Sequence, residues 1–245
     1  MAGILTLWKR ELLLYTRYKS RIIGSLGVPF FFLVSLGFGL NAVIQTGNVS
    51  YFAFLAPGIV GMMLLFNGMF SGLSVIQDRQ FGFLKEMLVA PIPRSSIVLG
   101  KAFGNATTSV VQGLLVLAIA IILGLSLNWL MLPAIMLTMF LISIGFVALG
   151  VGLAAILTDP QGFQFIMNFL VFPLFLLSGA LFPLSNSPPA LQTVAYVDPL
   201  TYGVDALRGL ALGANHLPLW IDFTVIIAFS VAMVLIATWL FRRMQ

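Results

Sequence analysis

The stretch Gln77–Lys101, QDRQFGFLKEMLVAPIPRSSIVLGK, is the only interior segment of this 245-residue chain in which charged residues gather. Long apolar runs lie on both sides of it, in a sequence that is 60% hydrophobic and 8% charged, with a mean hydropathy of +1.10. A soluble domain carries about 25% charged residues. The composition therefore predicts a membrane protein, and Gln77–Lys101 is expected to be a polar connection between two of its spans.

The apolar runs themselves indicate the fold class. Because lipid cannot hydrogen-bond the backbone, a spanning segment is a helix or part of a closed barrel. The runs are continuous rather than alternating, which favours an all-α polytopic membrane protein. About 20 apolar residues cross the hydrocarbon layer as a helix. The runs of sufficient length lie near 22–44, 53–76, 102–125, 129–157, 162–184 and 218–241, and a seventh, shorter run is Pro199–Ala214.

Basic residues predict the orientation, because cytoplasmic loops carry an excess of Lys and Arg. With six spans and both termini cytoplasmic, Arg208 is the one basic residue left outside, whereas seven spans would place Arg242 and Arg243 outside. We therefore predict six spans in a single transmembrane domain over residues 1–245. Burial of the charged residues of Gln77–Lys101 would cost on the order of 15 to 20 kcal/mol, so we interpret that stretch as a cytoplasmic loop.

Residues 3–21 have the pattern of an amphipathic helix. At 100° per residue, their apolar and aromatic side chains gather on one side and most basic ones on the other, with Glu11 and Lys19 as exceptions on the apolar side. The pattern predicts a helix in the cytoplasmic interface, either as an anchor for the first span or as a docking element for a partner. The charges follow and interrupt the apolar residues, unlike those of a cleavable signal, so we expect the segment in the mature protein.

Within the charged stretch, Phe81–Val89 forms a second amphipathic pattern. As a helix it groups five apolar side chains on one side and two charged ones opposite: Phe81, Phe83, Leu84, Met87 and Leu88 against Lys85 and Glu86. Pro91 and Pro93 would end this helix, since proline lacks the amide donor. The apolar face suits either lipid headgroups or a groove on a cytoplasmic partner, and the periodicity leaves both readings open.

Three motifs carry a resemblance to a known family. The stretch Asp78–Lys101 resembles the cytoplasmic loop of ABC-2 type transporter permeases, of the drug-resistance and polysaccharide-export branch. FPLFLLSGALFP at Phe172–Pro183 and DPLTYGVDALRG at Asp198–Gly209 are similar to two further motifs of that family, in the same order. The chain departs from the family pattern at Asp198, where asparagine is usual, and at Lys85, where a small or polar residue is commoner.

The resemblance implies the membrane subunit of an ATP-driven exporter in the plasma membrane of a prokaryote. Two copies of the permease would assemble with two copies of a separate ATP-binding-cassette ATPase, surrounded by membrane lipids and without nucleic acid. The residues implied to couple to the ATPase are Phe81, Gly82, Phe83, Leu84, Lys85, Glu86, Met87, Leu88 and Arg94. The chain contains no G-x-x-x-x-G-K-[ST] motif, so ATP and Mg would be bound by the partner and no cofactor by this chain.

The segment between the last two long runs predicts a short helix at the outer side. Pro199 suits the first helical position, with Asp198 near its N-cap. Asp205 and Arg208 stand three residues apart, so they are able to pair on one face. A 15-residue helix reaches only about 22 Å, so it would not cross. The family's short re-entrant helices, which would include Tyr202, favour a re-entrant segment over a plain outer cap.

Polar residues inside the runs have two readings. Asn67 and Gln112 either hydrogen-bond between helices or face a substrate path. The glycines of Gly68–Gly72 and Gly100–Gly104, and the group around Gly150, predict close helix approach. His216 is the only histidine, and without companion ligands it does not indicate a metal site.

Two other function classes were weighed against an exporter of a hydrophobic or lipid-linked substrate. An ion-coupled secondary transporter generally buries an ionisable group at mid-depth. The predicted spans hold none there, and Asp222 lies near the outer end of the last. A membrane-embedded enzyme would need a general base or a metal cluster, and the spans offer neither.

Overall fold

A computed structural model describes residues 2–17, 19–44, 49–83 and 93–243. Within these ranges the chain forms helices and no strands, which confirms the all-α prediction. The α-helices are α1 (Ala2–Arg17), α2 (Lys19–Gly39), α3 (Tyr51–Phe70), α4 (Gly72–Gln80), α6 (Arg94–Ile122), α7 (Leu132–Ile156), α8 (Pro160–Leu177), α9 (Pro189–Ala195), α10 (Pro199–Leu212) and α11 (Leu219–Arg243). Two 3-10 turns, Trp129–Met131 and Leu184–Asn186, complete them.

Five helical stretches in the described residues are long and apolar enough to cross a membrane: Tyr51–Gln80, Arg94–Ile122, Trp129–Ile156, Pro160–Leu177 and Leu219–Arg243. They correspond to the second to sixth predicted runs. The first run, predicted over 22–44, is represented by the shorter apolar stretch Gly24–Gly39. The predicted N-terminal helix also differs in extent, because α1 ends at Arg17 and α2 already begins at Lys19.

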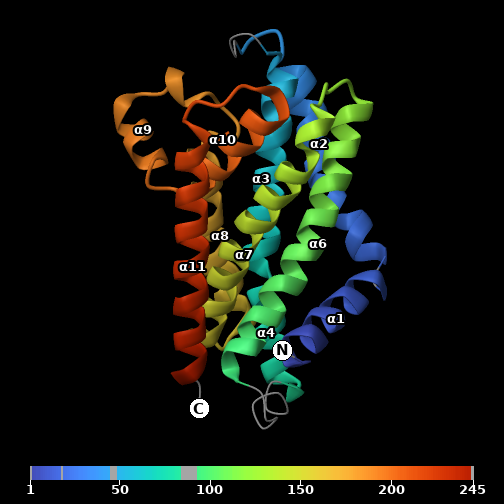
Figure 1. Cartoon of the computed structure of the whole chain (residues 1–245), viewed down its shortest axis with the longest axis vertical. Coiled ribbons are helices and arrows are strands. Elements are labelled where there is room, and N and C mark those ends of the chain that lie inside the picture. The colour runs from blue at the N-terminus through green and yellow to red at the C-terminus, as the bar shows by residue number, and fades with distance from the viewer. Residues whose placement is uncertain (1, 18, 45–48, 84–92, 244–245) are drawn as a thin grey trace.

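The helices form a bundle with distinct ends (Figure 1). The start of α1, the end of α11 and the facing ends of α4 and α6 lie at one end, and α9 and α10 lie at the other. The stretch containing α3 and α4 is the most buried span and α7 the next, with 72% and 61% of their apolar windows buried, against 22% for α8 and 17% for α11. The core is therefore built around α3 and α7.

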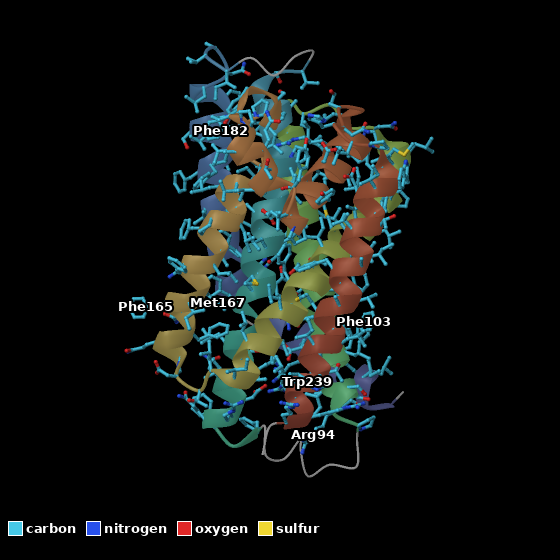
Figure 2. All side chains as sticks on the ribbon, turned by 90° about the vertical axis from the view of Figure 1, so that its left-hand side faces the viewer. Arg94, Phe103, Phe165, Met167, Phe182 and Trp239 are labelled. Carbon is cyan, nitrogen blue, oxygen red and sulfur yellow. The ribbon has the colours of Figure 1, made fainter. Side chains whose placement is uncertain are left out.

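The outer faces of α8 and α11 are apolar and open. Phe165 and Phe169 of α8 are 75% and 84% exposed, and Trp239 of α11 is 50% exposed. Figure 2 shows Phe165 projecting away from the bundle, whereas Met167, which is fully buried, lies on the inner side of the same helix. Large apolar side chains directed outward suit a lipid environment.

The charged stretch Gln77–Lys101 is not the simple loop that the sequence predicted. Helix α4 continues to Gln80, and α6 begins at Arg94, so Asp78 and Lys101 both lie inside helices and are buried. The prediction was wrong at these two ends because it treated each charge as unpaired. Residues 84–89 of the predicted helix Phe81–Val89 lie outside the described residues, which resume at Pro93.

Glycines allow the closest helix contacts in the core. A Cβ on Gly72 would overlap the carbonyl oxygen of Gly150, and a Cβ on Gly150 would overlap that of Met69. A Cβ on Gly68 would fall 2.7 Å from the Cβ of Phe146. The structure therefore confirms the packing role predicted for Gly68, Gly72 and Gly150 where α3 and α4 meet α7.

The substitution Gly150→Ala is expected to destabilise the bundle. The added methyl group forces α3 and α7 apart, and such overpacking costs about 1–3 kcal/mol, which lowers the melting temperature by roughly 3–10 °C. The measurement is thermal unfolding of the purified protein in detergent, followed by tryptophan fluorescence. Gly24→Ala is the control, since a Cβ at Gly24 meets nothing within 4 Å. Equal melting temperatures for the two variants would contradict the packing role.

Candidate functional site at the charged end of the bundle

Four ionisable side chains from three helices meet at the end of the bundle that holds the charged stretch. Lys101 Nζ of α6 lies 2.8 Å from Asp78 Oδ2 of α4 and 3.5 Å from Glu11 Oε1 of α1. Arg10 of α1 approaches the same carboxylates, with Nη2 2.8 Å from Asp78 Oδ1 and Nη1 3.6 Å from Glu11 Oε1. Two cations and two carboxylates therefore balance each other, and we call these four residues the charge cluster.

Burial makes this pairing obligatory. Lys101 has no exposed side-chain surface, and Ser74 Oγ accepts a further hydrogen bond from its Nζ at 3.2 Å. A buried charge without a partner costs several kcal/mol, and mutual pairing with extra hydrogen bonds offsets that cost. At the less buried end of the cluster, the hydrogen bond to the Asp78 carboxylate raises the pKa of Arg10. The charged form of Arg10 is therefore favoured.

The charge cluster also explains how α1 is held. Helix α1 packs along α6 at Gly100 and Gly104, where an added Cβ would fall 2.6 Å from the Cβ of Leu7 or Glu11. Trp8 Nε1 donates a hydrogen bond to Thr107 Oγ1 at 3.1 Å. The amphipathic helix predicted for the membrane interface is thus docked on its own bundle through its apolar side.

Two arginines within the charged stretch bind the ends of other helices. Arg79 donates to the carbonyls of Ala154, Ala155 and Leu157 at the C-terminus of α7, at 3.3 to 3.5 Å. Arg94 Nη1 donates to two carbonyls at the C-terminus of α11, those of Phe241 at 3.1 Å and Arg242 at 2.6 Å. The last carbonyls of a helix lack intrahelical partners, and cations there are stabilising. We call these contacts the arginine tethers; Arg94 lies at the end of the bundle in Figure 2.

Four of the predicted coupling residues are described: Phe81, Gly82 and Phe83 lie between the arginine tethers, and Arg94 forms one of these tethers. Phe81 and Phe83 are 75% and 52% exposed, and Gly82 has φ +83°. A positive φ is readily adopted by glycine, so Gly82 turns the chain out of α4. The other predicted residues of this group, Leu84, Lys85, Glu86, Met87 and Leu88, lie outside the described residues. The described part thus presents two aromatic side chains at the end of the bundle.

At the opposite end, the predicted helix start is confirmed. Asp198 caps α10, with Oδ1 accepting a hydrogen bond from Leu200 N at 2.9 Å, and Pro199 occupies the first turn. The Tyr202 hydroxyl donates to the carbonyl of Tyr196 at 2.8 Å, which ties α10 to the turn after α9.

The pairing predicted for Asp205 and Arg208 is wrong. Within the described residues they form no ion pair, and each is used by backbone groups instead. The Asp205 carboxylate accepts hydrogen bonds from His216 N and Leu217 N at 2.7 to 3.0 Å. Arg208 donates to three backbone carbonyls. Side chains three apart on a helix are able to pair, but here backbone groups of other segments compete for both.

Asn67 and Gln112 are brought together between three helices. Asn67 Nδ2 of α3 donates to Gln112 Oε1 of α6, and Gln112 Nε2 donates to Ser25 Oγ of α2 at 3.1 Å. They line a small polar cavity of about 80 Å³ that also borders Glu11. This arrangement agrees with the interhelical hydrogen-bonding reading, and a role in a substrate path stays a prediction.

The sequence was compared with known proteins. The sequence model of the family described as "ABC-2 type transporter" matches residues 2–212. This chain belongs to that family. It is similar to "Nodulation protein J" of Rhizobium leguminosarum bv. viciae, with 28% identity over 98% of this chain and 93% of the relative. "Nodulation protein J" of Rhizobium meliloti is 26% identical over 98% and 92%, and "Putative transport permease ycf38" of Pyropia yezoensis is 32% identical over 86% and 72%.

The sequence predictions did not anticipate the charge cluster of this ABC-2 protein. The sequence feature that indicates a buried ion pair is Glu11, which lies on the apolar side of α1 as an exception to the amphipathic pattern. An acid on a buried face predicts a buried cation elsewhere in the chain. Lys101 is that cation, 90 residues away.

The substitution Lys101→Met is expected to destabilise this ABC-2 protein strongly. It leaves two carboxylates with only Arg10, and breaking a buried ion pair costs about 3–5 kcal/mol. Thermal unfolding in detergent measures the loss. Lys9→Met, at an exposed position of α1, is the control. The double variant Asp78→Asn/Lys101→Met is expected to recover part of the stability, and a double variant no better than Lys101→Met would contradict the pairing.

Asp198 gives a prediction on pH. Its Oδ2 is buried with no hydrogen-bond partner in the described part of the chain, and burial raises its pKa to about 7, opposed by the hydrogen bond from Leu200 N. In the unfolded chain the pKa is about 3.9. Between about pH 4 and pH 7 the folded state therefore binds more protons, so stability falls as the pH rises through this window and is level above it.

The variant Asp198→Asn is expected to keep the cap of α10 and to remove that part of the pH dependence. Melting temperatures measured from pH 4.5 to 7.5 test this, because the wild type should fall over the window more steeply than the variant. Asp159→Asn alters the exposed cap of α8 and is expected to keep the wild-type slope. Parallel curves for wild type and Asp198→Asn would contradict the prediction.

Proposed function

We propose that this chain is the membrane-spanning subunit of an ATP-binding-cassette exporter that moves a hydrophobic or lipid-linked substrate outward. Membership in the ABC-2 type transporter family supports the transport role. The absence of a phosphate-binding G-x-x-x-x-G-K-[ST] motif from the sequence assigns ATP and Mg to a separate ATPase subunit. The observation that carries the proposal is the set of contacts around the charged stretch.

The charged stretch is connected to three separate parts of the bundle. The charge cluster ties it to α1, the Arg79 tether to α7 and the Arg94 tether to α11. A displacement of residues 81–93 by a partner would therefore act on these helices together. Exposed Phe81 and Phe83 supply the aromatic anchors by which a helix or turn docks into a groove. This is the arrangement that a coupling segment requires.

We assign six spans, with α2 as the first, and both termini in the cytoplasm of a prokaryotic cell. The start of α1 and the end of α11 lie at the same end of the bundle as the facing ends of α4 and α6 (Figure 1). That end carries Arg10, Arg79, Arg94 and Lys101, in agreement with the excess of basic residues on cytoplasmic sides. In the assembled exporter, two copies of the permease would join two ATPase subunits.

An ion-coupled secondary transporter is the second candidate, and Asp222 is the observation that favours it. This carboxylate has no exposed surface, and neither of its oxygens has a hydrogen-bond partner among the described residues. Buried ionisable groups in membrane segments often mark ion pathways. Uptake into inverted vesicles with and without ATP separates the candidates, because the exporter requires ATP and its ATPase subunit, whereas a secondary transporter requires an ion gradient alone.

The variants Phe83→Ala and Glu86→Ala are expected to uncouple the permease from its ATPase. Loss of an interface anchor costs about 2 kcal/mol or more, so ATPase affinity, or transport per ATP hydrolysed, should fall about tenfold or more. Both quantities are measured with the co-purified complex in proteoliposomes. Phe182→Ala is the control, since Phe182 is 50% exposed, close to the 52% of Phe83, but lies at the opposite end (Figure 2).

The same assay includes Arg94→Ala, which tests the tether to α11 rather than the docking surface. This variant is expected to bind the ATPase normally while transport per ATP falls. Arg17→Ala, at an exposed end of α1, controls for the loss of a basic residue.

Wild-type transport by Phe83→Ala and Glu86→Ala would overturn the assignment of the coupling segment.

A further inference from the structure

A large cavity lies at the end of the bundle opposite the charge cluster. It measures about 680 Å³ and is bounded by α3, α10, the turn after α8 and the turn before α11. Its lining includes Phe54, Tyr196, Asp205, Arg208 and His216. This volume falls in the range of about 300–1,000 Å³ that is typical of small-molecule sites. The coupling function proposed above assigns no role to it.

Arg208 is fixed rigidly in the wall of this cavity. Only 7% of the residue is exposed. Its Nε donates to Phe54 O at 3.1 Å, and its Nη2 donates to Gly179 O and Ala180 O, both at 2.9 Å. The guanidinium carbon lies 3.6 Å from the centre of the Phe54 ring. These contacts orient the guanidinium before any ligand arrives, which lowers the entropic cost of binding.

One nitrogen of the Arg208 guanidinium, Nη1, is not used by the hydrogen bonds to Phe54 O, Gly179 O and Ala180 O. Nη1 carries two N–H donors, and no atom of the described residues accepts from them. Nη1 is not one of the fully buried atoms that lack a partner, so its donors are accessible from the cavity that Arg208 lines. A nearly buried guanidinium with free donors provides the strongest available attraction for an anion.

The charges around Arg208 also favour an anionic ligand. Its protein acceptors are neutral carbonyls, and no carboxylate of the described residues lies within 4.0 Å of it. The oxygens of Asp205, one helical turn away, are already bound by backbone N–H groups of His216 and Leu217. Asp205 nevertheless adds negative charge to the cavity wall, so an anion with a single charge is favoured over a dianion.

The geometry also separates phosphate from carboxylate. A carboxylate binds arginine best through two parallel hydrogen bonds from adjacent nitrogens. Here Nη2 is occupied by two carbonyls, so Nη1 acts alone. Tyr196 and His216 also line the cavity, and their side chains carry further O–H and N–H donors. A tetrahedral phosphate has enough oxygens to meet donors from several directions.

We propose that this cavity binds a phosphate group carrying one negative charge, with Arg208 Nη1 as its principal donor and Tyr196 and His216 as additional donors. The chemistry is shared by the phosphodiester of a lipid headgroup and by free inorganic phosphate at mildly acidic pH. The proposal does not depend on the coupling function, because it concerns the opposite end of the molecule and binding without ATP.

The test uses the purified full chain in neutral detergent with three probes. Dihexanoylphosphatidylglycerol, inorganic phosphate and dihexanoylglycerol, which lacks phosphate, are titrated while the melting temperature and the heat of binding are recorded. We expect dihexanoylphosphatidylglycerol to bind and dihexanoylglycerol to have no effect. Binding of inorganic phosphate as well would show that the phosphate group alone is sufficient, and its failure would assign the site to the lipid headgroup.

Variants connect the binding to the cavity. Arg208→Ala removes three structural hydrogen bonds and is expected to unfold, so the informative variant is the double change Tyr196→Phe/His216→Ala at more accessible positions. Its affinity for dihexanoylphosphatidylglycerol should fall about tenfold or more, since hydrogen bonds to a charged group are the strong ones. Tyr15→Phe, in α1 and outside the lining of this cavity, is the control. Wild-type affinity in the double variant, or equal binding of dihexanoylglycerol, would overturn the proposal.

Discussion

The ion pairs of Asp78 and Lys101 are the constraint on which the charged end of this permease depends. They place two opposite charges 2.8 Å apart inside a region that water does not reach on the Lys101 side. Neither residue is tolerable there alone, because an isolated buried charge costs several kcal/mol. Their pairing in turn requires Glu11 and Arg10, and so fixes α1 against α6. These ion pairs therefore fix Asp78 of α4 and Lys101 of α6, which lie near the two ends of the charged stretch.

Arginine side chains bind backbone carbonyls at both ends of the bundle. Among the described residues, Arg79, Arg94 and Arg208 each donate to backbone carbonyls. Helices that end or break near a membrane leave carbonyl oxygens without partners, and a guanidinium has five N–H groups in a fixed plane. One arginine therefore satisfies two or three carbonyls at once. This use explains how a chain with few acidic residues accommodates the buried Arg208 and the partly buried Arg79 and Arg94.

Much of the fold was predictable because it depends on local composition. Five spans follow from continuous apolar runs, and the start of α10 follows from Asp198 and Pro199, whose effects act within one turn. The contacts between distant segments were not predictable in the same way. Arg10 meets Asp78 across 68 residues, and Arg208 meets Phe54 across 154. A single sequence shows that Glu11 lies on an apolar face, but which cation it meets is decided by packing.

Helix α11 connects the two ends of the molecule. At one end its last carbonyls are bound by Arg94, which is the first residue of α6 and lies within the charged stretch. At the other end, Asp205 of α10 binds the backbone of His216 and Leu217, immediately before α11 begins. Between these points α11 packs along α7, where Ser230 Oγ donates to Leu141 O at 2.8 Å. Helix α11 is therefore held by side-chain hydrogen bonds at both ends, by Arg94 at its C-terminus and by Asp205 just before its N-terminus. The two ends are thus physically linked, although they are formed by different parts of the sequence.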